Sequence, residues 1–256
     1  MDLQLKGKRA IVLGGTRGIG RAIAETLASE GADVAICARN ADQVEEAVAA
    51  LKKKGVRATG APVDIAKGAE LKTWVADAAK TLGGLDILIS NASALTQGAH
   101  IEAWEQLLKI DVLGAVNAFE AAREHLEAAA AERGDASCVF ISSVSAAETH
   151  NASAYGAIKA ALIHYAKGLA REYAKKKVRV NVVSPGTIYF KGGVWEMIEK
   201  NMPDRFSMSM KANPTGRMGT PQEIANASVF LASPMSTFTT GANLIVDGAI
   251  TQRVNF

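Results

Sequence analysis

The sequence has few cysteines and no long apolar run, and each shortage excludes a class of protein. Only Cys37 and Cys138 are present among 256 residues, both within apolar segments. Neither a disulfide framework nor a cysteine-based metal site is expected, and both thiols are predicted to be reduced and buried. No stretch of about 18 apolar residues is available to span a bilayer, and the first residues lack the apolar core of a signal peptide. We therefore expect a cytoplasmic protein.

Excess charge and histidine clusters are also missing. Lys and Arg number 29 against 26 for Asp and Glu, a net charge of +3, so neither nucleic acid nor a membrane is expected as a partner. The four histidines have no ligand-like spacing, and no metal site is predicted. Hydrophobic residues make up 48% and charged residues 21% of the chain, which is typical of a folded domain with a substantial core.

The sequence does contain a regular alternation of short β-branched runs and longer amphipathic segments. Candidate strands span 9–13, 33–38, 56–63, 85–90, 137–142, 179–184 and 243–246. Candidate helices span 19–30, 41–54, 67–82, 101–132, 152–176 and 221–232. This alternation predicts an α/β fold over residues 1–256: a single-domain, Rossmann-type doubly wound parallel sheet of about seven strands with helices on both faces. Segment 187–219 interrupts the alternation and is predicted to be a substrate-binding lid.

The first predicted strand runs directly into a glycine-rich loop, G-G-T-R-G-I-G at 14–20, and a helix follows. Glycines let backbone N–H groups approach a pyrophosphate at the positive end of the helix dipole. The spacing differs from the commoner G-x-G-x-x-G, and a tight strand-to-helix turn is the alternative interpretation. Its place at the first strand-to-helix turn favours a dinucleotide site. The candidate binding residues are Gly14, Thr16, Arg17, Gly18, Ile19 and Gly20.

The end of the second predicted strand favours NADP(H) over NAD(H). An NAD site commonly has a carboxylate there for the ribose hydroxyls, but this chain has Ala38 followed by Arg39. Arg17 and Arg39 are placed to converge on the 2′-phosphate of NADP, although either one alone is also typical of a solvated loop. Asp64, at the end of the third strand, is a candidate acceptor for the adenine amino group or a cap for the next helix.

Tyr155 and Lys159 lie four residues apart in a predicted helix. Residues at this spacing share one face, so the Lys159 ammonium is expected beside the Tyr155 phenol. A neighbouring cation favours the phenolate, which suits a general acid or base. The pair alone is also typical of an ordinary amphipathic helix, and the nucleotide loop makes hydride transfer the favoured interpretation.

These motifs together resemble the short-chain dehydrogenase/reductase family over nearly the whole chain. The segments that carry the resemblance are L-G-G-T-R-G-I-G at 13–20, S-N-A-S at 90–93, I-S-S-V at 141–144, Y-G-A-I-K at 155–159, N-V-V-S-P-G at 181–186, G-R-M-G-T-P-Q-E at 216–223 and T-G-A-N-L-I-V-D-G at 240–248. The resemblance implies NADP(H) as cofactor and a homo-oligomer, either a homotetramer or a dimer. The further cofactor-binding residues that it implies are Ile65, Asn91, Ala92, Tyr155, Lys159, Pro185, Gly186 and Ile188.

The resemblance also implies the catalytic roles. Tyr155 would donate or accept the proton, Ser143 would orient the substrate oxygen, and Lys159 would assist Tyr155 while holding the nicotinamide ribose. Ser142 is the rival of Ser143, because the loop from Ser143 to Tyr155 is shorter than usual in the family.

Two positions depart from the family pattern. Asp111 replaces an asparagine that supports a proton relay, and Phe190 replaces a threonine near the cofactor. An ionised Asp111 would place a negative charge near Lys159 and weaken its help to Tyr155, so reduced activity is predicted. Alternatively, the relay uses backbone geometry and the change is mild.

We predict an NADPH-dependent oxidoreductase, a carbonyl reductase that interconverts a ketone or aldehyde and a secondary or primary alcohol. Aromatic and methionine residues within 187–219 predict an adaptable apolar wall for a small-molecule substrate, and ordinary amphipathic helices are the alternative. A 3-oxoacyl-thioester reductase acting on an acyl carrier protein is an alternative activity, and a non-catalytic dinucleotide sensor is an alternative class. His150 and Asn151 are candidate pocket residues.

Overall fold

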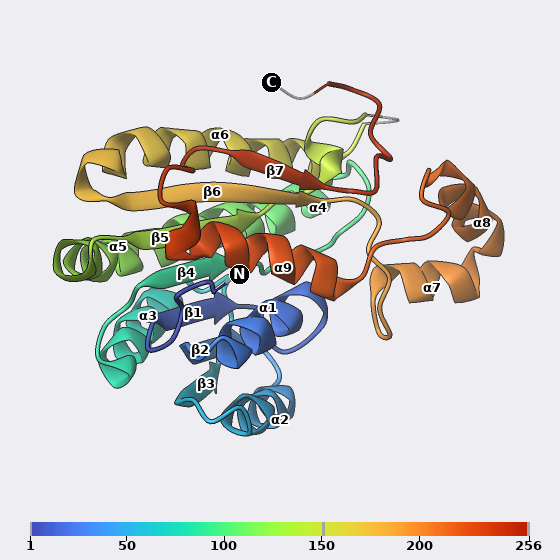
Figure 1. Ribbon diagram of the computed structural model, residues 1–256. Coiled ribbons are helices and arrows are strands. Elements are labelled where there is room, and N and C mark those ends of the chain that lie inside the picture. The colour runs from blue at the N-terminus through green and yellow to red at the C-terminus, as the bar shows by residue number, and fades with distance from the viewer. Residues whose placement is uncertain (1, 150–151, 255–256) are drawn as a thin grey trace.

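One sheet of seven parallel strands organises the computed structural model, which describes residues 2–149 and 152–254 (Figure 1). The strands are β1 (Arg9–Leu13), β2 (Asp33–Ala38), β3 (Ala58–Pro62), β4 (Ile87–Ser90), β5 (Ala136–Ile141), β6 (Val178–Pro185) and β7 (Asn243–Val246). Their order is β3-β2-β1-β4-β5-β6-β7, and each neighbouring pair is parallel. The predicted doubly wound sheet is confirmed, and its order reverses between β1 and β4, where such folds bind ligands.

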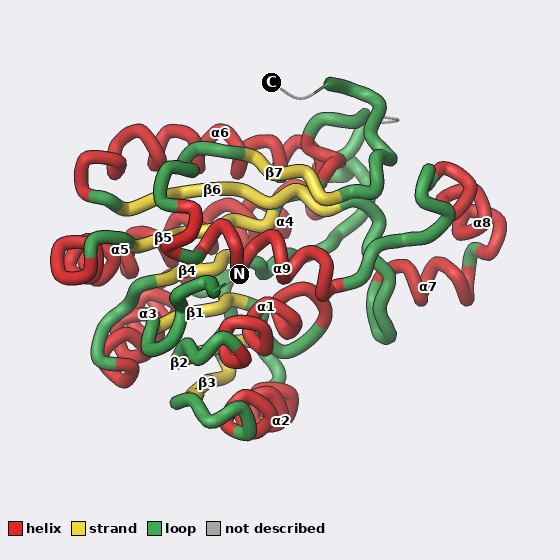
Figure 2. The backbone as a smooth tube through the Cα atoms, in the orientation of Figure 1, coloured by secondary structure: helices red, strands yellow, loops and turns green. Residues whose placement is uncertain are grey.

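Helices cover both faces of the sheet (Figure 2). The α-helices of the described residues are α1 (Gly18–Ser29), α2 (Ala41–Lys52), α3 (Gly68–Leu82), α4 (Ile101–Leu107), α5 (Leu113–Arg133), α6 (Ala154–Tyr173), α7 (Val194–Asn201), α8 (Pro203–Ala212) and α9 (Pro221–Ala232). Buried residues of α1, α2 and α9 form one core cluster with the sheet, and those of α3, α5 and α6 form another. The sheet therefore has a hydrophobic core on each of its two faces.

The chain is helical without a break over the predicted helix 101–132, but its geometry changes within that span, which the sequence did not predict. A π-helical turn, Leu108–Val112, separates α4 from α5 and contains Asp111. A π turn inserts one extra residue into the helical ladder, and such bulges occur mostly at functional sites. Apolar periodicity does not reveal a shift of one residue, which is why the sequence pattern predicted a continuous helix.

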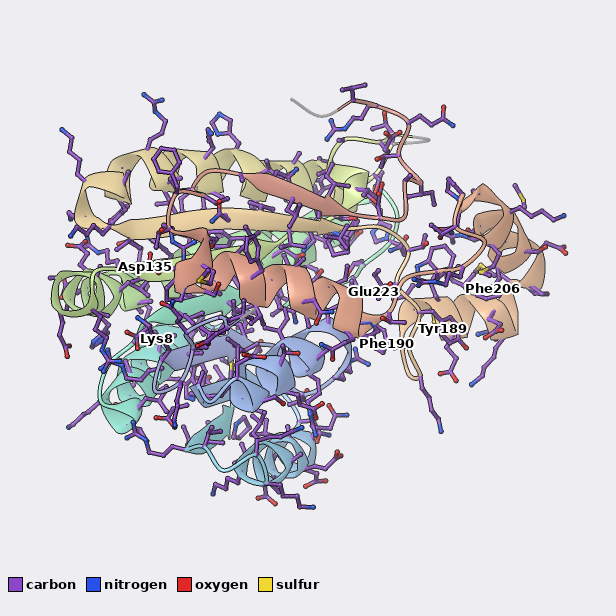
Figure 3. All side chains as sticks on the ribbon, viewed as in Figure 1. Lys8, Asp135, Tyr189, Phe190, Phe206 and Glu223 are labelled. Atoms are coloured by element: carbon purple, nitrogen blue, oxygen red, sulfur yellow. The ribbon has the colours of Figure 1, made fainter. Side chains whose placement is uncertain are left out.

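Residues 187–219 leave the sheet after β6, form α7 and α8, and return to the start of α9. The two helices extend beyond the body of the sheet (Figure 1). Ile188 and Gly219 form an isolated parallel bridge where the segment departs and returns. Tyr189 and Phe206, labelled in Figure 3, contact each other edge to face with ring centroids 6.1 Å apart. These contacts join the outgoing and returning parts of the segment to each other near its base.

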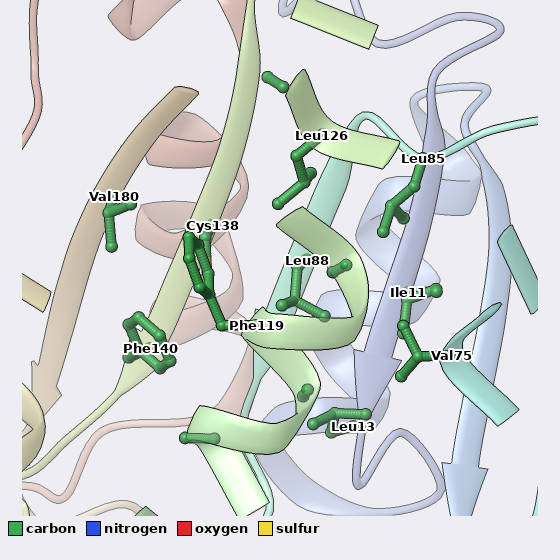
Figure 4. Close-up of a cluster of buried hydrophobic side chains, with 14 of the residues drawn as sticks. Ile11, Leu13, Val75, Leu85, Leu88, Phe119, Leu126, Cys138, Phe140 and Val180 are labelled. Carbon is green, nitrogen blue, oxygen red and sulfur yellow. The ribbon is translucent and has the colours of Figure 1, made fainter. Parts of the chain in front are cut away.

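The core between the sheet and helices α3 and α5 is densely packed (Figure 4). Phe119 is fully buried there and contacts Tyr173 edge to face, with centroids 5.2 Å apart. Cys37 and Cys138 are both buried and free, as predicted. Burial raises the pKa of both thiols, that of Cys37 to about 12, so they remain protonated packing residues.

Within the described part of the chain, no helix has the length and apolar character needed to cross a bilayer.

Candidate active site

The carboxyl edge of the sheet brings the predicted catalytic residues together. Ser142 and Ser143 directly follow β5, and Tyr155 lies in the first turn of α6. At Gly156, the next residue of that helix, an added Cβ would lie 2.5 Å from the carbonyl oxygen of Ser145. The missing side chain lets α6 contact the turn after Ser143 directly, which places Tyr155 beside that turn.

The two candidate serines differ in what their hydroxyl groups do. The Ser142 hydroxyl is buried and donates to the carbonyl oxygen of Lys159 at 2.9 Å. The Ser143 Oγ instead accepts a hydrogen bond from the Ser145 backbone N–H at 3.1 Å. Accepting uses a lone pair and leaves the hydroxyl proton able to point toward a ligand. This geometry favours Ser143 over Ser142 as the residue that orients a substrate oxygen.

Lys159 is almost fully buried, with 2% of its surface exposed. Its Nζ lies 3.0 Å from Asp111 Oδ2, donates to the Ile141 carbonyl oxygen at 3.1 Å, and lies 5.6 Å from the centroid of the Tyr155 ring. Burial opposes the charged form, but the phenolate of Tyr155 and the carboxylate of Asp111 outweigh it, so the pKa of Lys159 is raised. The site therefore contains a buried cation next to Tyr155.

Asp111 is the buried anion of this pair. Its Oδ1 accepts a hydrogen bond from the Ala94 backbone N–H at 2.9 Å. Its Oδ2 forms an ion pair with the Lys159 ammonium at 3.0 Å and has no other polar partner among the described residues. Buried carboxylate oxygens are usually satisfied, so this one marks the pair as part of an unfinished polar site.

The glycine-rich loop forms a tight cradle in which side chains at the glycines would clash with neighbouring atoms of the protein. Gly14 and Gly18 have φ values of +70° and +55°, which favour glycine. At Gly20, an added Cβ would lie 2.1 Å from the carbonyl oxygen of Gly14. The Asn91 Nδ2 donates to that same oxygen at 3.1 Å, so the first residue after β4 braces the loop.

The start of α1 has the features of an anion site. The N-cap residue Arg17 is extended and makes no side-chain hydrogen bond to the helix. The N–H groups of the first turn at Gly18, Ile19 and Gly20 thus lack a side-chain cap at the positive end of the helix dipole. This arrangement fits the pyrophosphate of a dinucleotide.

The Phe190 ring lies against this loop, a contact that sequence reasoning missed. An added Cβ at Gly18 would lie 2.5 Å from the Phe190 ring, and one at Gly193 would lie 2.9 Å from it. The Arg17 Nη1 also donates to the Gly192 carbonyl oxygen at 3.4 Å. Residues 190–193 therefore cover the start of α1. The only signal for this contact in the sequence was the pair Gly192 and Gly193 close to Phe190.

The residues predicted to select NADP lie at the open side of the loop. Arg17 and Arg39 are both exposed, and Thr16 is half-buried with its hydroxyl 3.5 Å from Gln43 Oε1. Their convergence on a 2′-phosphate stays a prediction.

At the end of β3, the Asp64 Oδ1 accepts from the Ala66 backbone N–H at 3.0 Å. Lys67, without a side-chain hydrogen bond, is the N-cap of α3, so the suggestion that Asp64 caps this helix was wrong. The turn made by Asp64 ends before the helix begins. Ile65 is buried, and its side chain occupies the space beside Gly114.

The remaining predicted cofactor residues line the same edge. Ala92 contacts Gly14, since a Cβ at Gly14 would lie 3.2 Å from the Ala92 Cα. Pro185 ends β6, and Gly186 packs closely on Asp247 beyond β7. His150 and Asn151 lie outside the described residues. Among residues 2–149 and 152–254, no group of three His, Cys, Asp or Glu side chains is arranged to hold a metal ion.

Known proteins with similar sequences cover nearly the whole chain. A protein-family profile described as enoyl-(acyl carrier protein) reductase matches residues 14–251. Isoepoxydon dehydrogenase of Penicillium expansum is 37% identical over 251 residues, which cover 96% of this chain and 95% of that protein. 2-(S)-hydroxypropyl-CoM dehydrogenase 3 of Xanthobacter autotrophicus is 33% identical over 257 residues, which cover 98% and 99%.

Solved structures agree. L-Sorbose reductase from Gluconobacter frateurii, complexed with NADPH and L-sorbose, matches with a TM-score of 0.89 at 32% identity, covering 99% of this chain and 100% of that chain. A short-chain dehydrogenase from Burkholderia cenocepacia in complex with NADP matches with a TM-score of 0.87 at 30% identity, covering 96% and 99%.

Proposed function

The chain belongs to the short-chain dehydrogenase/reductase family, and from this premise we propose that it is an NADP(H)-dependent carbonyl reductase with Tyr155 as its general acid and base. It is an oxidoreductase of the type that interconverts alcohols and carbonyl compounds. The observation that carries the proposal is the buried Lys159 ammonium beside Tyr155, at the same strand ends as the glycine cradle.

NADP(H) is the cofactor, and when bound it supplies or accepts the hydride. The start of α1 after the glycine cradle fits its pyrophosphate, since Arg17 gives the helix no side-chain cap and the N–H groups at Gly18, Ile19 and Gly20 lie at the positive end of the helix dipole. Arg17 and Arg39 are the candidates for the 2′-phosphate. Lys159 would hold the ribose next to the nicotinamide, and Pro185, Gly186 and Ile188 would line the ring.

In the reducing direction, the Tyr155 phenol donates its proton to the substrate oxygen while Ser143 donates a hydrogen bond to the same atom. The buried Lys159 cation stabilises the phenolate that remains, because a charge interaction is strong where water is excluded. In the oxidising direction, the Tyr155 phenolate accepts the proton. Ser142 contributes by fixing the α6 backbone at Lys159.

We place the substrate between this triad and segment 187–219, which would act as a lid. One relative is named for isoepoxydon and a neighbour binds L-sorbose, so a small oxygenated ketone or alcohol is the first choice of substrate. The 3-oxoacyl-thioester alternative is tested in the same assay.

The test is NADPH oxidation, followed by absorbance, against aliphatic, cyclic, polyhydroxylated and acyl-thioester ketones. Turnover should fall by about 10²-fold or more in Tyr155→Phe, which removes the exchangeable proton and keeps the ring. Tyr165→Phe, in the same helix, is the control. Binding of NADPH without turnover of any compound would contradict the proposal and favour the dinucleotide sensor.

We also propose a homo-oligomer in which a second copy covers the edge at β7. Phe238 is fully exposed there, and Phe230, Met235 and Leu244 nearby are each at least 36% exposed. Light scattering should give a dimer or tetramer, and Phe238→Glu should shift it toward monomer. A monomeric parent would contradict the proposal. The cytoplasmic location stays a prediction from the sequence.

A further inference from the structure

Two hydrogen-bond donors converge on Asp111 from opposite sides. The Ala94 backbone N–H donates to Oδ1 at 2.9 Å, and the Lys159 ammonium lies 3.0 Å from Oδ2. The Asp111 and Lys159 side chains are both buried, and 2% of the surface of each residue is exposed. A carboxylate offers an acceptor at both of its oxygens, whereas an amide offers one acceptor and one donor. Aspartate therefore suits this position because each of its oxygens faces one donor, the Ala94 N–H or the Lys159 ammonium.

Asparagine, which the family resemblance predicts here, does not fit these contacts. In one orientation its NH₂ group faces the Lys159 ammonium, and in the other it faces the Ala94 N–H. The cation makes the first orientation the less favourable one, so the amide oxygen would turn toward Lys159. The part-buried Ala94 N–H would then lose its acceptor, which is costly.

The segment that Asp111 holds, residues 93–98, flanks Tyr155. The Gly98 carbonyl oxygen accepts from the backbone N–H of Ala154, the residue before Tyr155, at 3.1 Å. Ala94 and Tyr155 pack against the same small buried cluster of α4 and α6 side chains. Leu95 has a φ of +54°, which is rare for a leucine and indicates a constrained loop.

We propose that Asp111 is a positioning residue whose two carboxylate oxygens hold Lys159 and loop 93–98 in one arrangement around Tyr155, and that asparagine does not replace it. The expected effect of Asp111 on kcat/KM and on the pH profile rests on the proposed function. The expected effect of Asp111 on the position of loop 93–98 does not. The role differs from the weakening effect expected from sequence, because the carboxylate supports the site from both sides.

The proposal has a defined pH signature. The titratable groups facing Lys159 are Tyr155 of α6 and Asp111 of the π turn, and the Ile141 carbonyl oxygen of β5 is its neutral partner. Asp111 is one of the groups that raise the pKa of Lys159. Replacing it with a neutral side chain lowers that pKa, so the alkaline limb of the activity profile should move to lower pH.

The experiment compares Asp111→Asn, Asp111→Glu and the exposed control Asp77→Asn with the parent. We expect Asp111→Asn to lose about 10- to 100-fold in kcat/KM, the range for a hydrogen bond to a charged group, with its alkaline limb displaced. Asp111→Glu, which keeps two acceptor oxygens, should restore the parent's pH profile. Asp77→Asn should behave as the parent. A thermal scan checks that each variant is folded at the assay temperature.

Amide hydrogen exchange, read by mass spectrometry on a peptide spanning 92–98, supplies a readout that needs no turnover. Exchange should be faster in Asp111→Asn than in the parent, because the Ala94 N–H loses its acceptor. If the parent turns over no substrate, the proposed function fails while this measurement still decides the inference. Unchanged exchange in Asp111→Asn, or parental kinetics and pH profile in that variant, overturns it.

Discussion

Strand β5 has a buried ion pair at each end, and the two pairs are satisfied to different degrees. At its start, Asp135 holds Arg179 with Oδ1 at 2.7 Å and Oδ2 at 3.1 Å. The Arg179 guanidinium also donates to acceptors at the end of α9 and beyond it. These acceptors are the carbonyl oxygens of Leu231, Ala232, Ser233 and Thr239 and the hydroxyl of Ser236. Asp135 is labelled in Figure 3.

At the other end of β5, the Ile141 carbonyl oxygen accepts from Lys159, and Asp111 Oδ2 has only its ion pair with Lys159 among the residues that the structure describes. A guanidinium with fixed donors suits the first place, and a single mobile ammonium suits the second. We conclude that the first pair joins α9 to the sheet, whereas the second keeps polar capacity for a reaction. The comparison separates stability from activity at the two ends of one strand.

The largest expected effect comes from replacing both members of the Lys159–Asp111 pair. Lys159→Met with Asp111→Leu should lower kcat/KM by about 10²- to 10⁴-fold, because the cation that supports Tyr155 is lost. Its free energy of unfolding should stay within about 2 kcal/mol of the parent, since apolar replacement of a buried pair is often neutral. Denaturant titration and steady-state kinetics check both. Strong destabilisation would mean that this pair is structural.

The corresponding double replacement of Arg179 and Asp135, at the start of β5, should lower stability and leave activity unchanged. Arg179→Met with Asp135→Leu should lower the free energy of unfolding by about 3 kcal/mol or more, because several buried acceptors lose their donor. The folded fraction should retain parental kcat/KM. Denaturant titration measures the first quantity, and kinetics normalised to folded protein the second. A neutral effect on unfolding would remove the contrast between the two pairs.

Sequence patterns predicted the sheet, both helical layers and the glycine cradle, because these features depend on local periodicity and on glycine spacing. They did not predict the π turn, whose one-residue insertion leaves the apolar pattern nearly unchanged. The family resemblance placed Asp111 near Lys159, but nothing in the sequence predicted that Asp111 also faces a second donor, the Ala94 N–H. That property depends on Ala94 and Lys159, which are distant in sequence and meet only after α4, α6 and the sheet have packed.

A smaller effect is expected at the proposed 2′-phosphate site, where the side chains are exposed and not buried as in the two ion pairs. Arg39→Ser should lower the ratio of kcat/KM for NADPH to that for NADH by about tenfold, because one charge-assisted contact to the 2′-phosphate is lost. Arg171→Ser, also exposed but on α6, is the control and should leave the ratio unchanged. An unchanged ratio in Arg39→Ser would show that Arg39 does not read the phosphate.

The smallest effect is expected at Phe190, whose ring fills the space between Gly18 and Gly193. We expect the Phe190 ring to move when the cofactor binds at the start of α1. The ring then loses its contacts with the glycine loop, and this loss weakens cofactor binding. Phe190→Thr removes those contacts, so we expect it to bind NADPH about fivefold more tightly, equivalent to about 1 kcal/mol. Fluorescence titration of the free protein with NADPH measures the dissociation constant without any substrate.

Phe206→Thr is the matched control, because it removes an aromatic ring from the same segment at a site where the ring contacts Tyr189 instead of the glycine loop. Its dissociation constant for NADPH should equal that of the parent. If Phe190→Thr binds NADPH more weakly than the parent, the ring must stay in contact with the bound cofactor. Residues 190–193 would then bind the cofactor directly, as is proposed for Lys159. The exposed cofactor loop and the buried Lys159–Asp111 pair would then both contribute to cofactor binding.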